Sequence, residues 1–450
     1  MSRSIQLRGA ASLLLSTTAL VGFLTAGAAL ATNTAAVDAQ ALTTVEPEEV
    51  GLSSERLARI DARMQEYLER EEMAGALGLI ARRGEVAYFE TWGEADRESG
   101  VPMTEDTIFR IYSMTKPITA VAVMMLYEEG KFFLNDPIGK YIPQLADLEV
   151  MTLTADGEGE EGATRKPKGP VTIKQLLNFT AGFTYGIFGN TPVDAMYRNA
   201  GILFADRDLE HFVTKLGEIP LQFEPGTRWH YSVAIDVLGR LVEVTSGMPF
   251  DEFLKQRLFA PLGMDDTDFW VPEEKLDRFA QLYRPVGAAD GPEAFLQAND
   301  SKAIEPAPAM TSRGFLSRPG APSGGGGLVS TAGDYLRFCQ MLLNGGELDG
   351  VRILSPKSVE LMSRNSLGDV PMGMGRSGYG FGLGVAVAMD QGDIGELGSD
   401  GEYNWGGAAG TRFWIDPEEE LIGIFMVQIL PHRTTQGSDF RQLTYQAIVD

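Results

Sequence analysis

The sequence is poor in cysteine and histidine, with one Cys and three His among 450 residues. A single cysteine, Cys339, excludes an internal disulfide, and the apolar run around it indicates a buried position. His211, His230 and His432 are scattered, and none has a recognisable catalytic context. A histidine-based triad and a metal site of clustered His or Cys are therefore both disfavoured, whereas a metal site made only of carboxylates stays open.

Two further absences narrow the class of function. Cations are few: 38 Lys and Arg stand against 62 Asp and Glu, which gives a net charge of -24. Binding to nucleic acid or to an anionic membrane is thus electrostatically disfavoured. The Gly-x-Ser-x-Gly nucleophile elbow of α/β-hydrolases is also missing. Catalysis by this chain would need a nucleophile that something other than histidine activates.

The first 31 residues have the pattern of a secretory signal. Arg3 and Arg8 precede an apolar stretch over 10–24, and Ala-Leu-Ala at 29–31 fits a small-x-small cleavage site. The mature chain would then begin near Thr32, in the periplasm or outside the cell. An uncleaved membrane anchor is the competing interpretation, but polar residues interrupt the stretch, which is shorter than the ~20 residues that span a bilayer. No later segment is long and apolar enough to span one.

Strand patterns occur near both ends of the remaining chain. With 44% hydrophobic residues overall, the chain can form one large domain or two ordinary ones. Short apolar runs at 76–81 and 86–92, joined by Arg-Arg-Gly-Glu, predict a β-hairpin. Strands are predicted again at 379–389, 406–415 and 421–429, the last two separated by a turn at 416–419.

The middle of the chain is predicted to be mainly helical. Apolar residues recur at helical spacing from Ile118 to Leu126, and Gly130 marks the end of that helix. The chain thus runs from strands, through helices and loops, back to strands. Further helices are predicted at 171–179, 250–259 and 436–449, and loops rich in Gly and Pro at 155–170 and 285–327, the second of which could line a pocket.

One short motif carries chemistry: Ser113-Met114-Thr115-Lys116 at the start of the predicted helix. Residues three apart share a helical face, so the Lys116 amine can lie beside the Ser113 hydroxyl with no third element to position it. A serine hydroxyl is a poor nucleophile, and a desolvated amine beside it can accept its proton. The alternative is an accidental match in which Ser113 caps the helix and Lys116 is solvated.

Three motifs in their usual order resemble the serine β-lactamase family, class C type: Phe109–Pro117, Pro225–Ser232 and Gly324–Asp334. The sequence Trp405–Thr411 is similar to the last motif of the family VIII carboxylesterases. The resemblance covers about residues 45 to 450, and the order of the motifs matters more than any one of them. It implies an α+β fold of the β-lactamase/transpeptidase type, in which N- and C-terminal strands form an antiparallel sheet flanked by helices, with a mainly helical subdomain inserted.

The resemblance also implies roles for individual residues. Ser113 would be the acylated nucleophile, Lys116 its proton acceptor, and Tyr231 a second base that acts only if a neighbouring ammonium stabilises its phenolate. The backbone amides of Ser113 and Ala408 would hold the oxyanion of the tetrahedral intermediate. The adjoining substrate pocket would be formed by Trp405, Gly406 and Gly407.

Two departures from the family pattern favour esters as substrates. Trp405 stands where β-lactamases and penicillin-binding peptidases carry the lysine of Lys-Thr-Gly, so the cation for a substrate carboxylate is missing. Val233 stands where an asparagine is expected two residues after the tyrosine, so an amide that would hold a peptide or lactam side chain is missing too. Arg412, predicted on the same strand as Trp405, could restore some positive charge.

We therefore predict a periplasmic or secreted serine carboxylesterase that acts on a small-molecule ester through an acyl-enzyme. It would need no cofactor or metal, bind no nucleic acid and have no stable membrane insertion once the signal is removed. The alternatives are a β-lactamase or D-alanyl-D-alanine carboxypeptidase, and a catalytically silent protein that binds cell-wall fragments. The predicted organisation is a signal peptide (1–31), a tether (32–44) and one hydrolase domain (45–450), with an α/β part at about 45–108 and 375–450 and a mainly helical part at about 109–374.

Overall fold

The computed structural model describes residues 42–152, 163–204, 207–291 and 293–450. The predicted signal peptide, most of the predicted tether and residues 155–162 of the first predicted loop lie outside the described residues. In the part of the chain that is described, no helix has the length and apolar character needed to cross a membrane. The predicted cleavage site and the predicted domain boundaries stay predictions.

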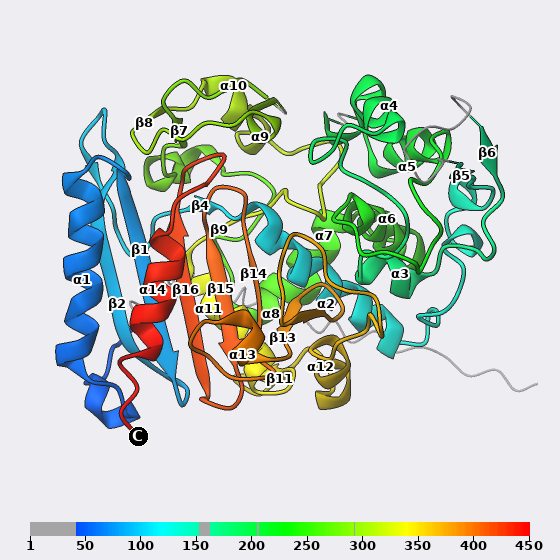
Figure 1. Cartoon of the computed structure of the whole chain (residues 1–450). Coiled ribbons are helices and arrows are strands. Elements are labelled where there is room, and N and C mark those ends of the chain that lie inside the picture. The colour runs from blue at the N-terminus through cyan, green and yellow to red at the C-terminus, as the bar shows by residue number, and fades with distance from the viewer. Residues whose placement is uncertain (1–41, 153–162, 205–206, 292) are drawn as a thin grey trace, which may run out of the picture. The chain divides into compact units, whose positions relative to one another are not determined.

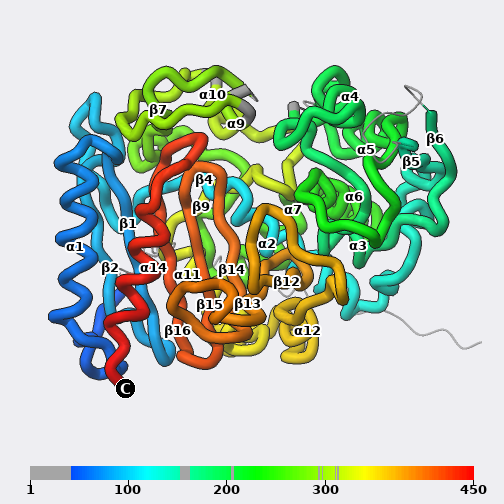
Figure 2. Tube along the Cα trace, viewed as in Figure 1, coloured from blue at the N-terminus to red at the C-terminus, as the bar shows by residue number. Residues whose placement is uncertain are grey.

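Eight antiparallel strands from both ends of the described chain form one sheet (Figure 1). The predicted hairpin is confirmed, because β1 and β2 pair along their length and Arg83 and Gly84 make the turn at positive φ. β1 also pairs with β16, with Ala76 opposite Val427, so the two ends of the fold lie side by side (Figure 2). In spatial order the strands are β12 (Tyr379–Phe381), β13 (Ala386–Ala388), β14 (Tyr403–Gly406), β15 (Arg412–Asp416), β16 (Leu421–Val427), β1 (Gly75–Arg82), β2 (Glu85–Asp96) and β3 (Val101–Pro102).

Two helices from opposite ends of the sequence cover one face of this sheet (Figure 1). α1 (Ser54–Glu69) begins after Ser53, whose hydroxyl accepts a hydrogen bond from the Arg56 amide. α14 (Gln436–Tyr445) packs beside α1, and its Phe440 ring lies 5.9 Å from the Trp414 ring of β15. Burial of these rings against the sheet stabilises the layer through the hydrophobic effect.

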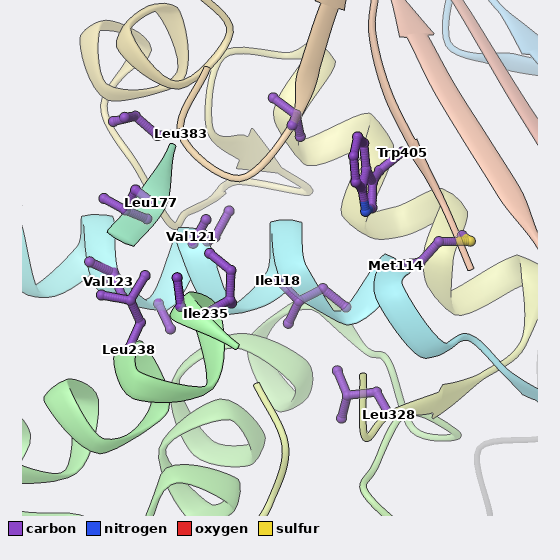
Figure 3. Close-up of a cluster of buried hydrophobic side chains, with 14 of the residues drawn as sticks. Met114, Ile118, Val121, Val123, Leu177, Ile235, Leu238, Leu328, Leu383 and Trp405 are labelled. Carbon is purple, nitrogen blue, oxygen red and sulfur yellow. The ribbon is translucent and has the colours of Figure 1, made fainter. Parts of the chain in front are cut away.

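The opposite face of the sheet packs against the mainly helical part. Its central helix, α2 (Thr115–Glu128), is buried from Thr115 to Leu126, as expected of a helix that is apolar on all sides. Figure 3 shows Ile118 and Val121 of α2 in a cluster that includes Ile235 of α6. The other helices are α3 (Ile173–Leu177), α4 (Pro192–Ala200), α5 (Leu209–Gly217), α6 (Ala234–Ser246), α7 (Phe250–Leu254), α8 (Ala260–Leu262), α9 (Glu293–Leu296), α10 (Ala309–Ser312), α11 (Ala332–Leu343), α12 (Pro356–Met362) and α13 (Gln391–Ile394).

Several predicted elements differ from the structure in their boundaries. The segment predicted as a strand at 379–389 folds into β12 and β13, because Gly384 turns the chain at a φ of 90°. The helix predicted at 171–179 is confined to α3, since Phe179 takes a left-handed φ of 58°. The loop predicted at 285–327 contains α9, α10 and part of a short ladder. The short ladders pair β4 (Phe109–Arg110) with β9 (Val329–Ser330), β5 (Val150–Met151) with β6 (Thr164–Arg165), β7 (Tyr283–Pro285) with β8 (Ile304–Pro306) and β10 (Glu347–Leu348) with β11 (Val351–Arg352).

Candidate active site

Ser113 lies in a 3-10 turn, η2 (Tyr112–Met114), that leads directly into α2. The preceding strand β4 pairs with β9, which fixes where the turn begins. Tyr112 takes a left-handed φ of 41°, a conformation that costs energy for any residue with a Cβ. The packed surroundings therefore hold Ser113 at a sharp bend, where it lines a cavity of about 730 Å³.

Lys116 lies one turn further along and meets Ser113 as predicted. Its Nζ donates a hydrogen bond to Ser113 Oγ over 3.0 Å. The whole Lys116 side chain is buried, with 0% relative exposure. This burial lowers the pKa of Lys116 from 10.5 to about 7, even though the charge of Asp236 acts to raise it. A large fraction of Lys116 is therefore an uncharged amine near neutral pH, able to take a proton.

The groups around Lys116 explain how a lysine can be buried there. Its Nζ donates a short hydrogen bond to the carbonyl oxygen of Gly325 and lies over the rings of Tyr231 and Tyr185, at 4.6 and 5.3 Å from their centroids. Asp236 of α6 is the carboxylate that acts on it electrostatically. These contacts offset part of the cost of removing an amine from water.

The glycine-rich motif that begins at Gly324 has a packing role in this arrangement. A Cβ on Gly325 would lie 2.4 Å from Asp236 Oδ2 and 2.9 Å from Tyr185 Oη. The Gly325 amide donates to Asp236 Oδ1 over 3.0 Å, and the Ser323 hydroxyl donates to the same oxygen over 2.5 Å. Only glycine fits at this position, where the backbone lies between Asp236 and Lys116 and makes a hydrogen bond with each of them.

Tyr231 lies in the segment before α6 and lines the same cavity as Ser113. The Trp405 indole Nε1 donates a hydrogen bond to Tyr231 Oη over 3.3 Å, and the Trp229 ring stacks on Tyr231 with an interplanar angle of 8°. Burial raises the pKa of Tyr231, while hydrogen bonds with Ser113 and Trp405 act to lower it. Tyr231 therefore keeps its phenolic proton at neutral pH.

Trp405 and Gly406 end β14, and Gly407 and Ala408 follow in a turn. The predicted strand at 406–415 is not continuous, because the Gly407 amide donates to the Thr411 carbonyl over 2.7 Å and closes this turn. The turn brings the backbone of Ala408 to the wall that also contains Ser113. Among the described residues, no backbone carbonyl accepts a hydrogen bond from the Ala408 amide.

Gly407 lines the cavity, as predicted, and it also lies where two protein segments approach each other closely. A Cβ there would lie 2.5 Å from the carbonyl oxygen of Ile111, in the chain that leads to Ser113. A Cβ on Gly406 would meet only the Thr411 carbonyl oxygen, at 3.2 Å. The absence of a side chain at Gly407 thus sets how closely the Ala408 turn approaches the segment that contains Ser113.

The cavity that unites these residues has a volume of about 730 Å³. Phe188, with 49% of its surface exposed, and Phe295 from the long 285–327 segment form an aromatic wall, their ring centroids 5.9 Å apart. The prediction that this segment could line a pocket is thus confirmed. The predicted site residues in the lining are Ser113, Tyr231, Trp405, Gly406, Gly407 and Ala408, while Lys116 lies behind Ser113.

Arg412 does not lie on the strand of Trp405, so that prediction is wrong. It begins the neighbouring strand β15, where it pairs with Gly406, because the turn at 407–411 separates the two strands. Paired residues of antiparallel strands share a face, and along β14 Gly406 faces away from Trp405. Val233, the other residue of the substrate argument, is buried at the start of α6.

Two further residues belong to the site but were not identified from the sequence. Arg376 lines the cavity, and the Asp236 carboxylate acts electrostatically on Lys116. Asp236 lies five residues after Tyr231 in an otherwise apolar run, and a lone acid in such a run was a usable signal. Arg376 lies in a Gly- and Met-rich loop that carries no motif, and no sequence signal identifies it.

In the described part of the chain, the histidines and the cysteine make no hydrogen bond with Ser113, Lys116 or Tyr231. His230 contacts Thr184 Oγ1 over 3.2 Å, away from the nucleophile. His432 lines the cavity, but burial lowers its pKa to about 4, so it is neutral. Cys339 is buried, as predicted. Within the described ranges, no group of three or more His, Cys, Asp or Glu side chains could hold a metal ion.

Comparison with known proteins agrees with this fold and these motifs. A family model described as Beta-lactamase matches residues 60–446. An uncharacterized protein of Mycobacterium tuberculosis is 35% identical over 380 residues, which are 82% of this chain and 89% of that protein. Esterase EstB of Burkholderia gladioli is 34% identical over 382 residues, 83% of this chain and 90% of EstB.

A solved structure also matches over most of its length. EstCE1, described as a hydrolase with promiscuous acyltransferase activity, superposes with a TM-score of 0.70 at 27% identity, covering 88% of this chain and 99% of EstCE1. The chain therefore belongs to the beta-lactamase family of hydrolases. The α+β fold and the family resemblance predicted from the sequence motifs are both confirmed.

Proposed function

We propose that this protein is a serine carboxylesterase that forms an acyl-enzyme on Ser113. The observation that carries the proposal is the 3.0 Å hydrogen bond between Ser113 Oγ and the buried Lys116 amine, whose pKa is lowered by burial to about 7. A base with a pKa near the working pH is the most effective one for general-base catalysis. The similarity to esterase EstB supports an ester as the substrate.

In the first step, Lys116 Nζ takes the hydroxyl proton of Ser113 while Ser113 Oγ forms a bond to the ester carbonyl carbon. The carbonyl oxygen becomes an oxyanion, and the backbone amides of Ser113 and Ala408 are the donors that would hold it. This assignment is supported by the presence of both residues in the cavity wall and by the free Ala408 amide.

In the second step, the intermediate collapses and the bond to the alcohol oxygen breaks. The departing alkoxide needs a proton, which the Lys116 ammonium supplies through the Tyr231 hydroxyl. Tyr231 is suited to such a relay because burial keeps its phenol protonated and Ser113 and Trp405 hold its oxygen by hydrogen bonds. Water then attacks the acyl carbon while Lys116 takes a proton from it. The bond between the acyl carbon and Ser113 Oγ breaks, the carboxylic acid leaves, and Lys116 returns the proton to Ser113 Oγ.

At Trp405 the wall beside Ser113 offers no ammonium to the carboxylate of a lactam, which favours an ester as the substrate. Trp405 presents an indole where lactam-processing relatives present an ammonium, and its N–H is already used by Tyr231. A charge-assisted hydrogen bond contributes ~1.5–3 kcal/mol, so its loss lowers lactam recognition by about 10- to 100-fold. Arg412 faces away from Trp405 across the end of β14 and does not replace that ammonium.

The test is the ratio of kcat/KM for a butyrate ester to kcat/KM for a chromogenic cephalosporin. We expect a ratio well above one, and one that falls in Trp405→Lys. Trp405→Phe is the matched control, because it also removes the indole N–H donated to Tyr231 but adds no cation. A wild-type ratio below one would replace the esterase assignment with a β-lactamase. Turnover of neither compound by the folded protein would favour the non-catalytic alternative.

We also propose that the protein is exported, on the strength of the signal pattern in its first 31 residues. A periplasmic or extracellular esterase would meet small-molecule esters before they enter the cell.

A further inference from the structure

The active-site cavity continues past the end of β14 to the opposite face of the sheet. Trp405 and Phe413 belong to the face that carries Tyr231, whereas Trp414 belongs to the cluster under α1 and α14. Side chains from both faces line the one cavity, Arg412 and Trp414 on the α14 side among them. A ligand bound at Ser113 can thus extend toward Arg412.

Gly406 makes this continuity possible. It pairs with Arg412 across β14 and β15, so a side chain at 406 would stand beside the arginine on the same face. An added Cβ there would have a single neighbour within 4 Å, the Thr411 carbonyl oxygen, so the space over Gly406 is open. Between Ser113 and Arg412, the cavity wall is therefore formed by the backbone of Gly406, with no side chain above it.

Three arginines of the lining have no carboxylate partner in the described part of the chain, and one of them, Arg433, donates to the Ala294 carbonyl oxygen over 2.8 Å. Arg412 donates to Ser438 Oγ over 3.1 Å, and Arg376 donates to Asn404 Oδ1 over 3.1 Å and stacks 4.0 Å above the Tyr379 ring. Burial lowers the pKa of Arg412, and the nearby Arg376 charge acts in the same direction, while Glu396 acts to raise it. A guanidinium that keeps open donors beside a cavity can accept an anion bidentately.

The net charge at the Arg412 end of the cavity indicates which kind of anion would bind there. Arg441 is neutralised by Glu396 and Glu402, at 3.0 and 2.6 Å. His432 is neutral, since burial lowers its pKa to about 4. Four arginines of the lining stand against two of its carboxylates and against Glu402, which lies behind the lining and pairs with Arg441. The excess of one positive charge suits a singly charged carboxylate better than a doubly charged phosphate. The residues counted are Arg376, Arg412, Arg433 and Arg441 against Asp393 and Glu396 of the lining and Glu402 behind it.

We propose that Arg412 and Arg376 form a carboxylate subsite, so that the preferred substrates are esters that carry a carboxylate away from the bond to be cleaved. The inference rests on the proposed esterase function and adds the substrate class to it. The carboxylate approaches over Gly406, takes the free N–H groups of the two arginines, and holds the ester with its carbonyl at Ser113.

Two pairs of chromogenic or ultraviolet-absorbing esters test the subsite. The charged ester of the first pair carries its carboxylate on the acyl group, and that of the second pair carries it on the leaving group. One pair is a p-nitrophenyl monoester of a dicarboxylic acid, in lengths of about four to eight carbons, and the p-nitrophenyl alkanoate of equal length. The other is 4-carboxyphenyl butyrate and 4-carbamoylphenyl butyrate. In Arg412→Gln and in Arg376→Gln, we expect kcat/KM for the charged ester of at least one pair to fall about 10- to 100-fold. The neutral partner should change less than about 3-fold.

Two controls separate binding from structure and from net charge. Ser438→Ala removes the hydrogen-bond partner of Arg412 but keeps the cation, so it should leave the charged-to-neutral ratio unchanged. Arg364→Gln removes a cation from an exposed side chain that pairs with Glu360 outside the cavity, and it should also leave the ratio unchanged. If Arg412→Gln and Arg376→Gln lower both members of both pairs equally, or if Ser438→Ala mimics them, the subsite is refuted while the esterase stands.

A binding measurement keeps the proposal testable if no ester is hydrolysed. Titration of Ser113→Ala with glutarate or adipate should change the fluorescence of Trp405 and Trp414, which line the cavity. The dissociation constant should rise about 10-fold or more when Arg412→Gln is added. Equal affinity in both proteins, or tighter binding of inorganic phosphate than of the dicarboxylates, would overturn the carboxylate subsite whatever the fate of the proposed reaction.

Discussion

Lys116 is the residue at which burial and charge act against each other. Removal from water lowers its pKa, and the neighbouring Asp236 carboxylate acts to raise it. The outcome, a pKa of about 7, makes this lysine a base at physiological pH, which an exposed lysine with a pKa near 10.5 is not. The rate of the proposed reaction should therefore depend on pH as the titration of Lys116 does.

We predict that kcat/KM for a butyrate ester increases with pH through about 7 and is constant above it. The reason is that only the neutral amine accepts the Ser113 proton, so activity falls as Lys116 gains a proton at low pH. Asp236→Asn removes the charge that raises the pKa of Lys116, so its acid limb should shift to lower pH. The pH profiles of the two proteins measure this, and an Asp236→Asn limb at higher pH would contradict the electrostatic account.

Lys116 and Tyr231 should act as one proton network, so the effects of their losses should not add. Lys116→Ala and Tyr231→Phe should each lower kcat by ~10²–10⁴-fold, because each removes a member of the same relay. The double variant should lose much less than the product of the two. Tyr185→Phe is the matched control, since its ring also faces Lys116, at 5.3 Å, but it has no place in the relay. Strictly multiplicative losses would rule out the coupling.

At the scale of elements, the turn from Gly407 to Thr411 connects the geometry of β14 and β15 to the candidate active site. It separates β14 from β15, carries the Ala408 amide and lies against the chain before η2. Local sequence could predict the glycines as a point of close approach, but it could not decide what approaches. That depended on the register of β14 with β15, which places Arg412 opposite Gly406.

We predict that Gly407→Ala lowers kcat by about 10²–10³-fold, comparable to the loss of one oxyanion donor. The new Cβ would meet Ile111 O at 2.5 Å and push the Ala408 turn away from Ser113. Gly406→Ala, whose Cβ has one contact at 3.2 Å, should lose less. Steady-state kinetics with thermal unfolding of both variants checks this. Equal losses in the two, or a Gly407→Ala defect explained by unfolding alone, would contradict the role of the turn.

At the scale of the whole molecule, the sequence predicted the parts that depend on local pattern. The β1–β2 hairpin followed from two apolar runs around Arg83-Gly84, and α2 followed from its helical spacing. Ser113 and Lys116 could be paired because three residues of helix bring them together whatever the rest of the chain does. Asp236 and Arg376 reach the site only through tertiary packing of α6 and of a loop, so the local pattern could mark Asp236 as an unusual acid in an apolar run but could place neither residue at the site.

Export is the remaining prediction at this scale. The signal pattern predicts a mature protein that begins near Thr32, because Ala-Leu-Ala at 29–31 suits cleavage. N-terminal sequencing of the periplasmic or culture fraction should find that terminus. An intact Met1 terminus in the membrane fraction would support the anchor interpretation instead.

The central claim, that Ser113 is the nucleophile, is tested most directly by covalent labelling with an active-site-directed alkyl phosphonate. Mass spectrometry of the digested protein should place one phosphonyl group on the peptide that contains Ser113. Ser377→Ala is the control, because Ser377 lines the same cavity and should not affect labelling. The account predicts that Ser113→Ala is unlabelled and inactive toward esters, and that Ser377→Ala is labelled like the wild type. A phosphonyl group on any other serine, or unchanged esterase activity in Ser113→Ala, would contradict it.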